Sequence, residues 1–245
     1  MNNILGYGQT EYIDCSLHWF GHDNEELYKY NLKTNRYKLS MYGWLNSESA
    51  ITYQFNQWGF RTPEFESTGG IMFLGCSHVV GIGLPDQYTF SRLVSDELGL
   101  EMYRLGVGAG SNDTAFRIAD YWIPQLKPKY VVLLETHRGR MEIVNSDRFS
   151  RIRPGVDNKY TSSQYYKDFI SNDHNIELLR KKNLFGIEHI CREHSAVFVT
   201  LDVEGYMFSN IAQCDQARDL MHVGKKGNEV IANEFVRLIK NVQSV

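Results

Sequence analysis

Residues 71–83, IMFLGCSHVVGIG, place two polar side chains directly after an apolar segment. Residues 71–75 form a continuous apolar run that ends at a glycine, which is typical of a parallel strand buried on both faces. Ser77 and His78 follow this run at once. Because functional groups in open parallel sheets gather at the carboxyl ends of the strands, we expect a functional site at this turn.

Strand and helix patterns alternate along the chain from residue 70 onward. Short apolar runs indicate strands, and amphipathic stretches bounded by capping residues indicate helices. The expected strands lie in residues 71–75, 101–110 (where the strand runs into a glycine loop), 129–136 and 195–202, and the expected helices cover 85–99, 111–128, 173–194 and 225–242. This order predicts an α/β fold with a doubly wound parallel sheet.

Residues 1–69 have a different character, being rich in Tyr, Trp, Asn and Gly. Their pattern indicates short strands and turns with little helical periodicity. Gly69 and Gly70 mark a boundary, so we divide the chain into an N-terminal extension, residues 1–69, and an α/β domain, residues 70–245. We expect the extension to pack on the domain rather than to fold alone. Polar residues 144–175 predict a long insertion before the helix that follows them.

Composition excludes several classes of function. A formal net charge of -3 offers no basic surface for nucleic acid. No apolar run approaches the length of about 18 residues that a membrane span needs. The first residues lack a basic region followed by an apolar core, so we expect no Sec-type signal peptide and a chain that is cytoplasmic as synthesised. Four cysteines, at positions 15, 76, 191 and 214, form no CxxC pair, which favours free thiols over a metal site.

Residue types suited to acyl transfer stand at the expected strand ends. A serine such as Ser77 needs a base to take its proton. His222 can be that base if Asp219, three residues earlier, orients its ring. Backbone N–H groups at Ser77 and near Gly110 could hold a developing oxyanion.

Each of these residues also has an ordinary structural explanation. Ser77 could be only the N-cap of a helix, and Asn112 could cap the next one. His222 alone would more often be a polar residue with no chemical role. Arg138 could be exposed to solvent or paired with Glu135 or Glu142, and we expect Cys76 to be a small packing residue rather than a nucleophile. The combination of serine, aspartate and histidine at suitable positions favours catalysis.

Three segments together resemble one hydrolase family. FLGCSHVVGIG, LGVGAGSND and DLMHVGKKGNEVIA are similar, in this order, to the conserved blocks of the SGNH (GDSL-type) hydrolases, over roughly residues 70–240. The resemblance implies a three-layer α/β/α domain with a parallel, flavodoxin-like sheet of five strands. It also implies that Ser77 is the nucleophile, His222 the base and Asp219 the residue that orients it. Gly110 would lie near the glycine whose N–H joins the oxyanion hole.

Two positions depart from the family pattern. Cys76 replaces the aspartate of the first block. The third block, Gly-x-Asn-Asp in the family, is replaced by ETHRGR at residues 135–140, so an amide donor to the oxyanion is missing. We expect the side chain of Asn112 to replace it, with His137 or Arg138 as the next choice. His78, His137 and Arg138 are also candidates for substrate binding.

The resemblance implies a serine esterase that needs no metal or organic cofactor. FNQWGFRTPEF is similar to a segment that precedes the hydrolase core in carbohydrate-modifying members, so we expect an O-acetylated carbohydrate as substrate. FLGCSHVVGIGLPD resembles phage-encoded members, which adds a virion-associated role and assembly into a larger complex or homo-oligomer to the expectations. Two alternatives stay open: an O-acyltransferase of the same fold, and a non-catalytic binding or structural protein, which the missing amide favours.

Overall fold

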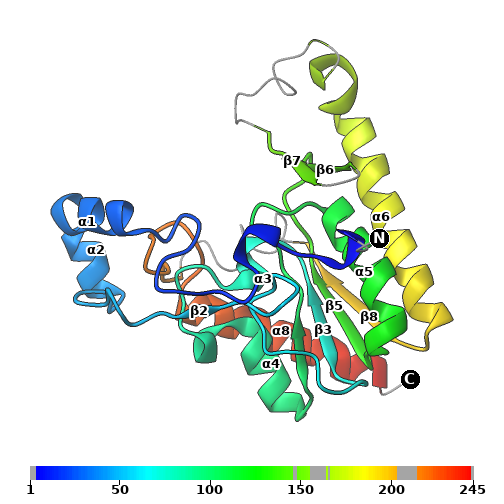
Figure 1. Ribbon diagram of the computed structural model, residues 1–245, viewed down its shortest axis with the longest axis horizontal. Coiled ribbons are helices and arrows are strands. Elements are labelled where there is room, and N and C mark those ends of the chain that lie inside the picture. The colour runs from blue at the N-terminus through cyan, green and yellow to red at the C-terminus, as the bar shows by residue number, and fades with distance from the viewer. Residues whose placement is uncertain (1–3, 146–147, 155–163, 165, 203–213, 244–245) are drawn as a thin grey trace.

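A parallel sheet of four strands forms the centre of the computed structural model, which describes residues 4–145, 148–154, 164, 166–202 and 214–243 (Figure 1). The spatial order is β4-β3-β5-β8. The strands are β3 (Ile71–Leu74), β4 (Met102–Arg104), β5 (Tyr130–Leu134) and β8 (Val197–Leu201). Within the described ranges this sheet has one strand fewer than the five that the family resemblance implied. Ser77 follows β3, where the strand order reverses direction, as is typical of ligand sites in such sheets.

Helices cover both faces of this sheet. Successive side chains of a strand point to opposite faces, so Met72 and Leu74 pack on one side while Ile71 and Phe73 pack on the other. The first side is covered by α5 (Asn112–Leu126) and α6 (Asp173–Glu193), and the second by α4 (Phe90–Leu98) and α8 (Lys225–Gln243). The predicted three-layer α/β/α arrangement is therefore confirmed.

The N-terminal extension contains two helices that the sequence pattern did not predict. Its elements are the single turns Ile4–Gly6 and Thr10–Tyr12, the paired strands β1 (Ser16–Leu17) and β2 (Tyr53–Gln54), and the helices α1 (Glu25–Thr34) and α2 (Arg36–Met41). Asn24 caps α1 by accepting the Leu27 N–H at 2.8 Å. Only Tyr28 and Asn31 of α1 are buried, so its apolar face is too narrow to give a periodic signal.

The insertion also contains regular structure in its described part. Strands β6 (Met141–Val144) and β7 (Phe149–Ile152) form an antiparallel hairpin, and a π-helical turn (Tyr166–Ile170) precedes α6. Figure 1 shows this hairpin and the start of α6 projecting beyond the sheet. A buried ion pair between Arg117 of α5 and Glu142 of β6, at 2.6 Å, attaches the hairpin to the domain. Within the predicted insertion, residues 146–147, 155–163 and 165 lie outside the described residues.

A buried ion pair joins the extension to the loop before α8. The Arg218 guanidinium donates to both carboxylate oxygens of Asp23, at 2.8 and 2.6 Å, and the two side chains are 0% and 1% exposed. Arg218 also donates to the Ser47 carbonyl at 2.6 Å. Trp44 of the extension donates its indole N–H to the Gln216 carbonyl at 2.8 Å. The extension is thus bonded directly to residues next to Asp219.

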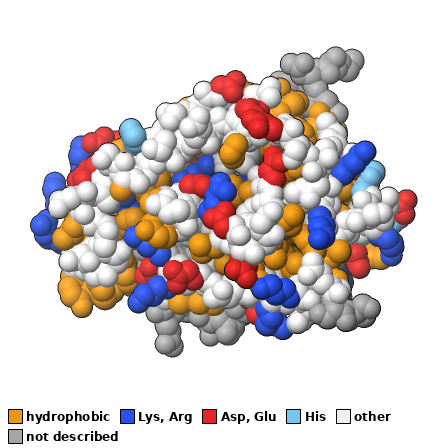
Figure 2. All heavy atoms as spheres, turned by 90° about the horizontal axis from the view of Figure 1, so that it is seen from below, with side chains coloured by type: hydrophobic (Ala, Val, Ile, Leu, Met, Phe, Trp, Pro, Cys, Tyr) orange, Lys and Arg blue, Asp and Glu red, His pale blue; other side chains and the backbone are white. Residues whose placement is uncertain are grey.

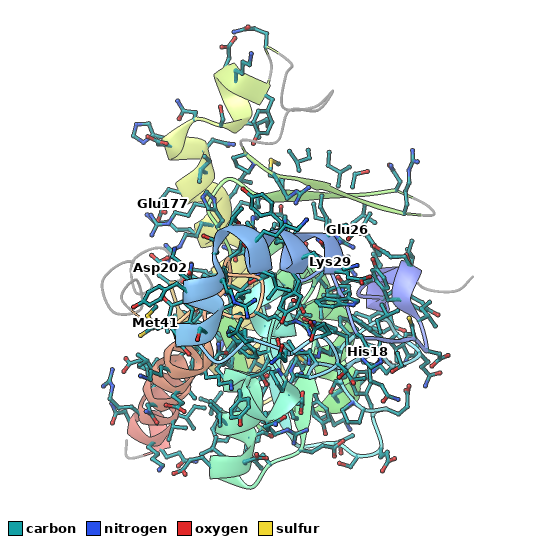
Figure 3. All side chains as sticks on the ribbon, turned by 90° about the vertical axis from the view of Figure 1, so that its left-hand side faces the viewer. His18, Glu26, Lys29, Met41, Glu177 and Asp202 are labelled. Atoms are coloured by element: carbon teal, nitrogen blue, oxygen red, sulfur yellow. The ribbon has the colours of Figure 1, made fainter. Side chains whose placement is uncertain are left out.

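The described helices and one face of the molecule give information about its surface. No helix in the described ranges has the length and apolar character to cross a membrane. On the face seen in Figure 2, acidic and basic side chains are interspersed. Figure 3, viewed from the side of α1 and α2, labels the exposed residues Lys29 and Met41 on these helices.

The substitution Asp23→Ala is expected to lower the free energy of unfolding by about 3–5 kcal/mol, because it leaves the Arg218 guanidinium buried without a counter-ion. Urea unfolding followed by circular dichroism measures this loss. Glu25→Gln is the matched control, since it breaks the exposed ion pair with Lys29 and should leave the unfolding midpoint unchanged. A loss for Asp23→Ala no larger than for the control would contradict the prediction.

Candidate active site

The chain turns sharply between β3 and Ser77, and glycine makes this turn possible. Gly75 has φ +145°, and a Cβ there would lie 2.5 Å from the Leu134 carbonyl oxygen. The short helix α3 (Ser77–Val80) then begins at Ser77. Arg61 of the extension donates to the carbonyls of Val80 and Gly81, at 3.1 and 2.7 Å, and so satisfies the end of this helix. Both ends of α3 are therefore fixed.

Ser77, His222 and Asp219 form one continuous hydrogen-bonded chain. Ser77 Oγ lies 2.9 Å from His222 Nε2, and His222 Nδ1 lies 2.5 Å from Asp219 Oδ2. The second carboxylate oxygen, Oδ1, accepts the backbone N–H groups of Met221 and His222, both at 3.0 Å. A carboxylate held in this way fixes both the position and the tautomer of the imidazole. The structure therefore brings Ser77, which follows β3, together with Asp219 and His222, which lie in the loop before α8.

Hydrogen bonding keeps Asp219 ionised although it is buried. Burial alone would raise the pKa of Asp219. The hydrogen bond from His222 and the two backbone N–H groups outweigh burial, so the pKa of Asp219 lies below its ordinary value. Asp219 is thus a carboxylate at neutral pH and can accept a hydrogen bond from the Nδ1–H group of His222.

His78 stands beside this chain as a neutral ring. Its centroid lies 5.3 Å from that of His222 in an edge-on arrangement. Burial lowers the pKa of His78 to about 3, and the nearby charges of His222 and Arg140 contribute to the shift. A neutral His78 adds no positive charge next to His222. His78 lines the cavity next to His222.

A cavity of about 400 Å³ opens onto Ser77 Oγ and His222. Segments from the extension, the strand ends and the hairpin region all line it. The lining residues used below are Gln9, Glu11, Tyr12, Phe20, Gly108, Ala109, Arg140 and Arg153. The volume is within the range of pockets that hold small ligands. In the described part of the chain no group of three His, Cys, Asp or Glu side chains is placed to hold a metal ion.

Four of the predicted site residues lie away from this cavity or have other partners. The Gly110 N–H, expected to meet the oxyanion, donates to the Val107 carbonyl at 2.9 Å. Asn112, His137 and Arg138 line a separate hollow of only about 20 Å³. The side-chain oxygen of Asn112, Oδ1, accepts the backbone N–H of Thr136 there at 3.1 Å.

Arg138 is paired with acidic side chains, whereas the two carboxylates that the sequence suggested for it, Glu135 and Glu142, pair with Arg180 and Arg117. Its guanidinium contacts Asp202 and lies 3.9 Å from Glu177, two residues labelled in Figure 3. With these partners on the side of the small hollow, Arg138 does not face Ser77.

Ala109, which the sequence did not single out, faces the cavity instead of Gly110. Its backbone is left-handed, with φ +59°, an uncommon conformation for a residue with a Cβ. Within the described part of the chain, the Ala109 and Ser77 N–H groups have no hydrogen-bond partner. The GxGxG run pointed to this loop, but it could not indicate which N–H the turn would leave unpaired.

Comparisons with known proteins give only partial similarities. No protein-family model matches the sequence, and no curated protein matches it. The structure is similar to that of the psychrotrophic esterase EstA from Pseudoalteromonas sp., at 15% identity and a TM-score of 0.39, over 71% of this chain and 98% of EstA. It is also similar to CEX, a two-domain esterase active on acetylated mannans, at 11% identity and a TM-score of 0.38. That match covers 73% of this chain and 50% of CEX.

The four cysteines differ in burial, and we expect them to differ in their rates of reaction with a thiol reagent. At pH 8 a thiol reagent is expected to modify the half-buried Cys15 and Cys214 well before Cys76 and Cys191, which are 3% and 1% exposed. Burial also raises the pKa of Cys191 to about 12, so its thiolate is scarce at this pH. Mass spectrometry of digested protein after timed labelling identifies the modified sites. Rapid modification of Cys76 in the folded protein would contradict its role as a packing residue.

Proposed function

We propose that this protein is a serine esterase, which hydrolyses acyl esters through a covalent acyl-enzyme. The observation that carries the proposal is the hydrogen-bonded chain from Ser77 through His222 to Asp219, which ends in a cavity large enough for a small ester. Such a chain makes a hydroxyl nucleophilic at neutral pH. Ser77 lies far in the sequence from His222 and Asp219, and a purely structural role for Ser77 would not require these two residues beside it.

The geometry supports a two-step reaction. Ser77 Oγ attacks the ester carbonyl while His222 Nε2, 2.9 Å away, takes the hydroxyl proton. Asp219 stays ionised and stabilises the imidazolium that forms. His222 then gives the proton to the departing alkoxide, which leaves an acyl group on Ser77. Water, deprotonated by His222, attacks this acyl group, and His222 returns that proton to Ser77 Oγ as the acid leaves.

Two backbone N–H groups are available for the negative charge that develops on the carbonyl oxygen. These are the unpartnered donors of Ser77 and Ala109. The Gly108 carbonyl, in the same peptide unit as the Ala109 N–H, accepts a hydrogen bond from Arg151 at 3.0 Å. A trans peptide directs its carbonyl and N–H in opposite directions, and a cation on the carbonyl polarises the N–H. Arg151 thus orients and strengthens the Ala109 donor.

We further propose an O-acetylated carbohydrate as the substrate class. The cavity walls combine the aromatic rings of Tyr12 and Phe20 with side chains that can bond to hydroxyl groups, namely Glu11, Arg140 and Arg153. This mixture suits a sugar, which has apolar faces and many hydroxyls. An acyltransferase would use the same first step, with an acceptor alcohol in place of water. Product analysis with and without an added sugar alcohol distinguishes these outcomes.

The proposed function predicts a reactive Ser77. A fluorophosphonate probe should label the wild-type protein at Ser77, and hydrolysis of p-nitrophenyl acetate should fall by about 10³-fold or more in Ser77→Ala. The matched control is Ser40→Ala at an exposed helix position, which should change neither quantity. If folded wild-type protein is neither labelled by the probe nor active on acetyl esters, the result contradicts the proposal and favours a binding role.

A further inference from the structure

One buried side chain in the cavity has an unsatisfied donor. Gln9, in the N-terminal extension, is 2% exposed, and its Nε2 has no hydrogen-bond partner among the described residues. Its Oε1 accepts the Gly108 N–H at 3.2 Å. Because a backbone N–H can only donate, the atom of the amide that faces Gly108 must be the oxygen. The orientation of the NH₂ group therefore follows from chemistry and does not depend on an arbitrary choice of rotamer.

The main chain of Gln9 is held in place on both sides. Its N–H donates to the Gly59 carbonyl at 3.1 Å, and its carbonyl accepts the Tyr12 N–H at 3.0 Å. Gly59 has φ +71°, and a Cβ at this position would lie 2.4 Å from the Gln9 carbonyl oxygen. The close approach requires glycine, so the two segments are fitted to each other. A buried donor held this rigidly cannot turn away to find solvent.

Gln9 is held against the loop that follows β4, and this loop lies beside the Ser77 turn. The Val107 N–H donates to the Gly75 carbonyl at 3.1 Å, which joins the glycine loop to the end of β3. The next residue, Gly108, is the one that Gln9 contacts. Gln9, Ser77 and Ala109 all line the same cavity. Burying an unpaired amide donor is costly, so such a group in a cavity marks the position of a ligand acceptor.

We propose that Gln9 is a catalytic residue whose Nε2 donates the third hydrogen bond to the oxyanion, beside the Ser77 and Ala109 N–H groups. This inference rests on the proposed esterase function. In the ground state the carbonyl oxygen is a modest acceptor, whereas the tetrahedral intermediate carries a full negative charge there. The donor is already oriented by Gly108, so it needs no rearrangement when the charge forms. The bond therefore acts mainly in the transition state.

Two variants test the donor. Gln9→Glu keeps an oxygen for Gly108 but replaces the NH₂ group with an acceptor, and Gln9→Met keeps the length of the side chain without either polar atom. With p-nitrophenyl acetate, both are expected to lower kcat by about 10²–10³-fold and to change KM by less than about threefold. The rate of Ser77 phosphonylation by the fluorophosphonate probe should fall in parallel. Thermal melts show whether each variant is folded, and the conclusion is drawn from the folded ones.

Control variants separate the possible outcomes. Gln125→Glu makes the same chemical change on the exposed side of α5 and should leave both rates unchanged. A folded Gln9 variant with unchanged kcat, while Ser77→Ala is inactive, would overturn this inference and leave the esterase function standing. A change confined to KM would also overturn it, because Gln9 would then be a ground-state binding group. A large loss of kcat in Asn112→Ala but not in the Gln9 variants would overturn it as well. Wild-type protein that is neither labelled nor active would overturn both the function and the role of Gln9.

Discussion

The buried ion pair between Asp23 and Arg218 is the constraint on which the geometry of the site depends. Arg218 directly precedes Asp219, so the guanidinium fixes the backbone from which the carboxylate projects. Tyr53 donates to Asp23 at 2.5 Å and accepts the Gly83 N–H at 2.7 Å, and the Gly83 carbonyl accepts the Arg218 N–H at 3.1 Å. This closed network links the extension, the loop after α3 and the loop before α8. Outer groups of this kind orient the residues that act on a substrate.

The glycine loop after β4 is supported in the same manner by three separate parts of the chain. The extension contacts it through Gln9, the hairpin through Arg151, and the end of β3 through the Gly75 carbonyl. Gly108 is bonded on both sides, with its N–H donated to Gln9 and its carbonyl accepting from Arg151. The positions of the remaining N–H donors are thus set by segments outside the sheet. The extension and the insertion are components of the site as much as the α/β domain is.

The sequence predicted what depends on local pattern and missed what depends on distant contacts. The strands and core helices were evident because apolar runs and amphipathic periods mark them. The positions of Ser77 at a strand end and of Asp219 and His222 just before the last helix pointed to their meeting. Helix α1 was missed because it buries too little to show a period. The use of the Gly110 N–H inside its own turn is a matter of loop conformation that composition does not reveal. The contact between Gln9 and Gly108 spans 99 residues and leaves no trace in either segment.

The ion pair between Asp23 and Arg218 also has a consequence for biosynthesis. Asp23 and Arg218 are separated by 195 residues, so the carboxylate leaves the ribosome long before its cation is made. At a synthesis rate of about 5–20 residues per second, that interval lasts roughly 10–40 s. During this time Asp23 has no counter-ion, so burying its carboxylate is unfavourable in free energy. The apolar surfaces of the extension that pack on later segments also remain exposed. The buried ion pair, and with it the final position of Asp219, can form only after the segment that contains Arg218 has been synthesised.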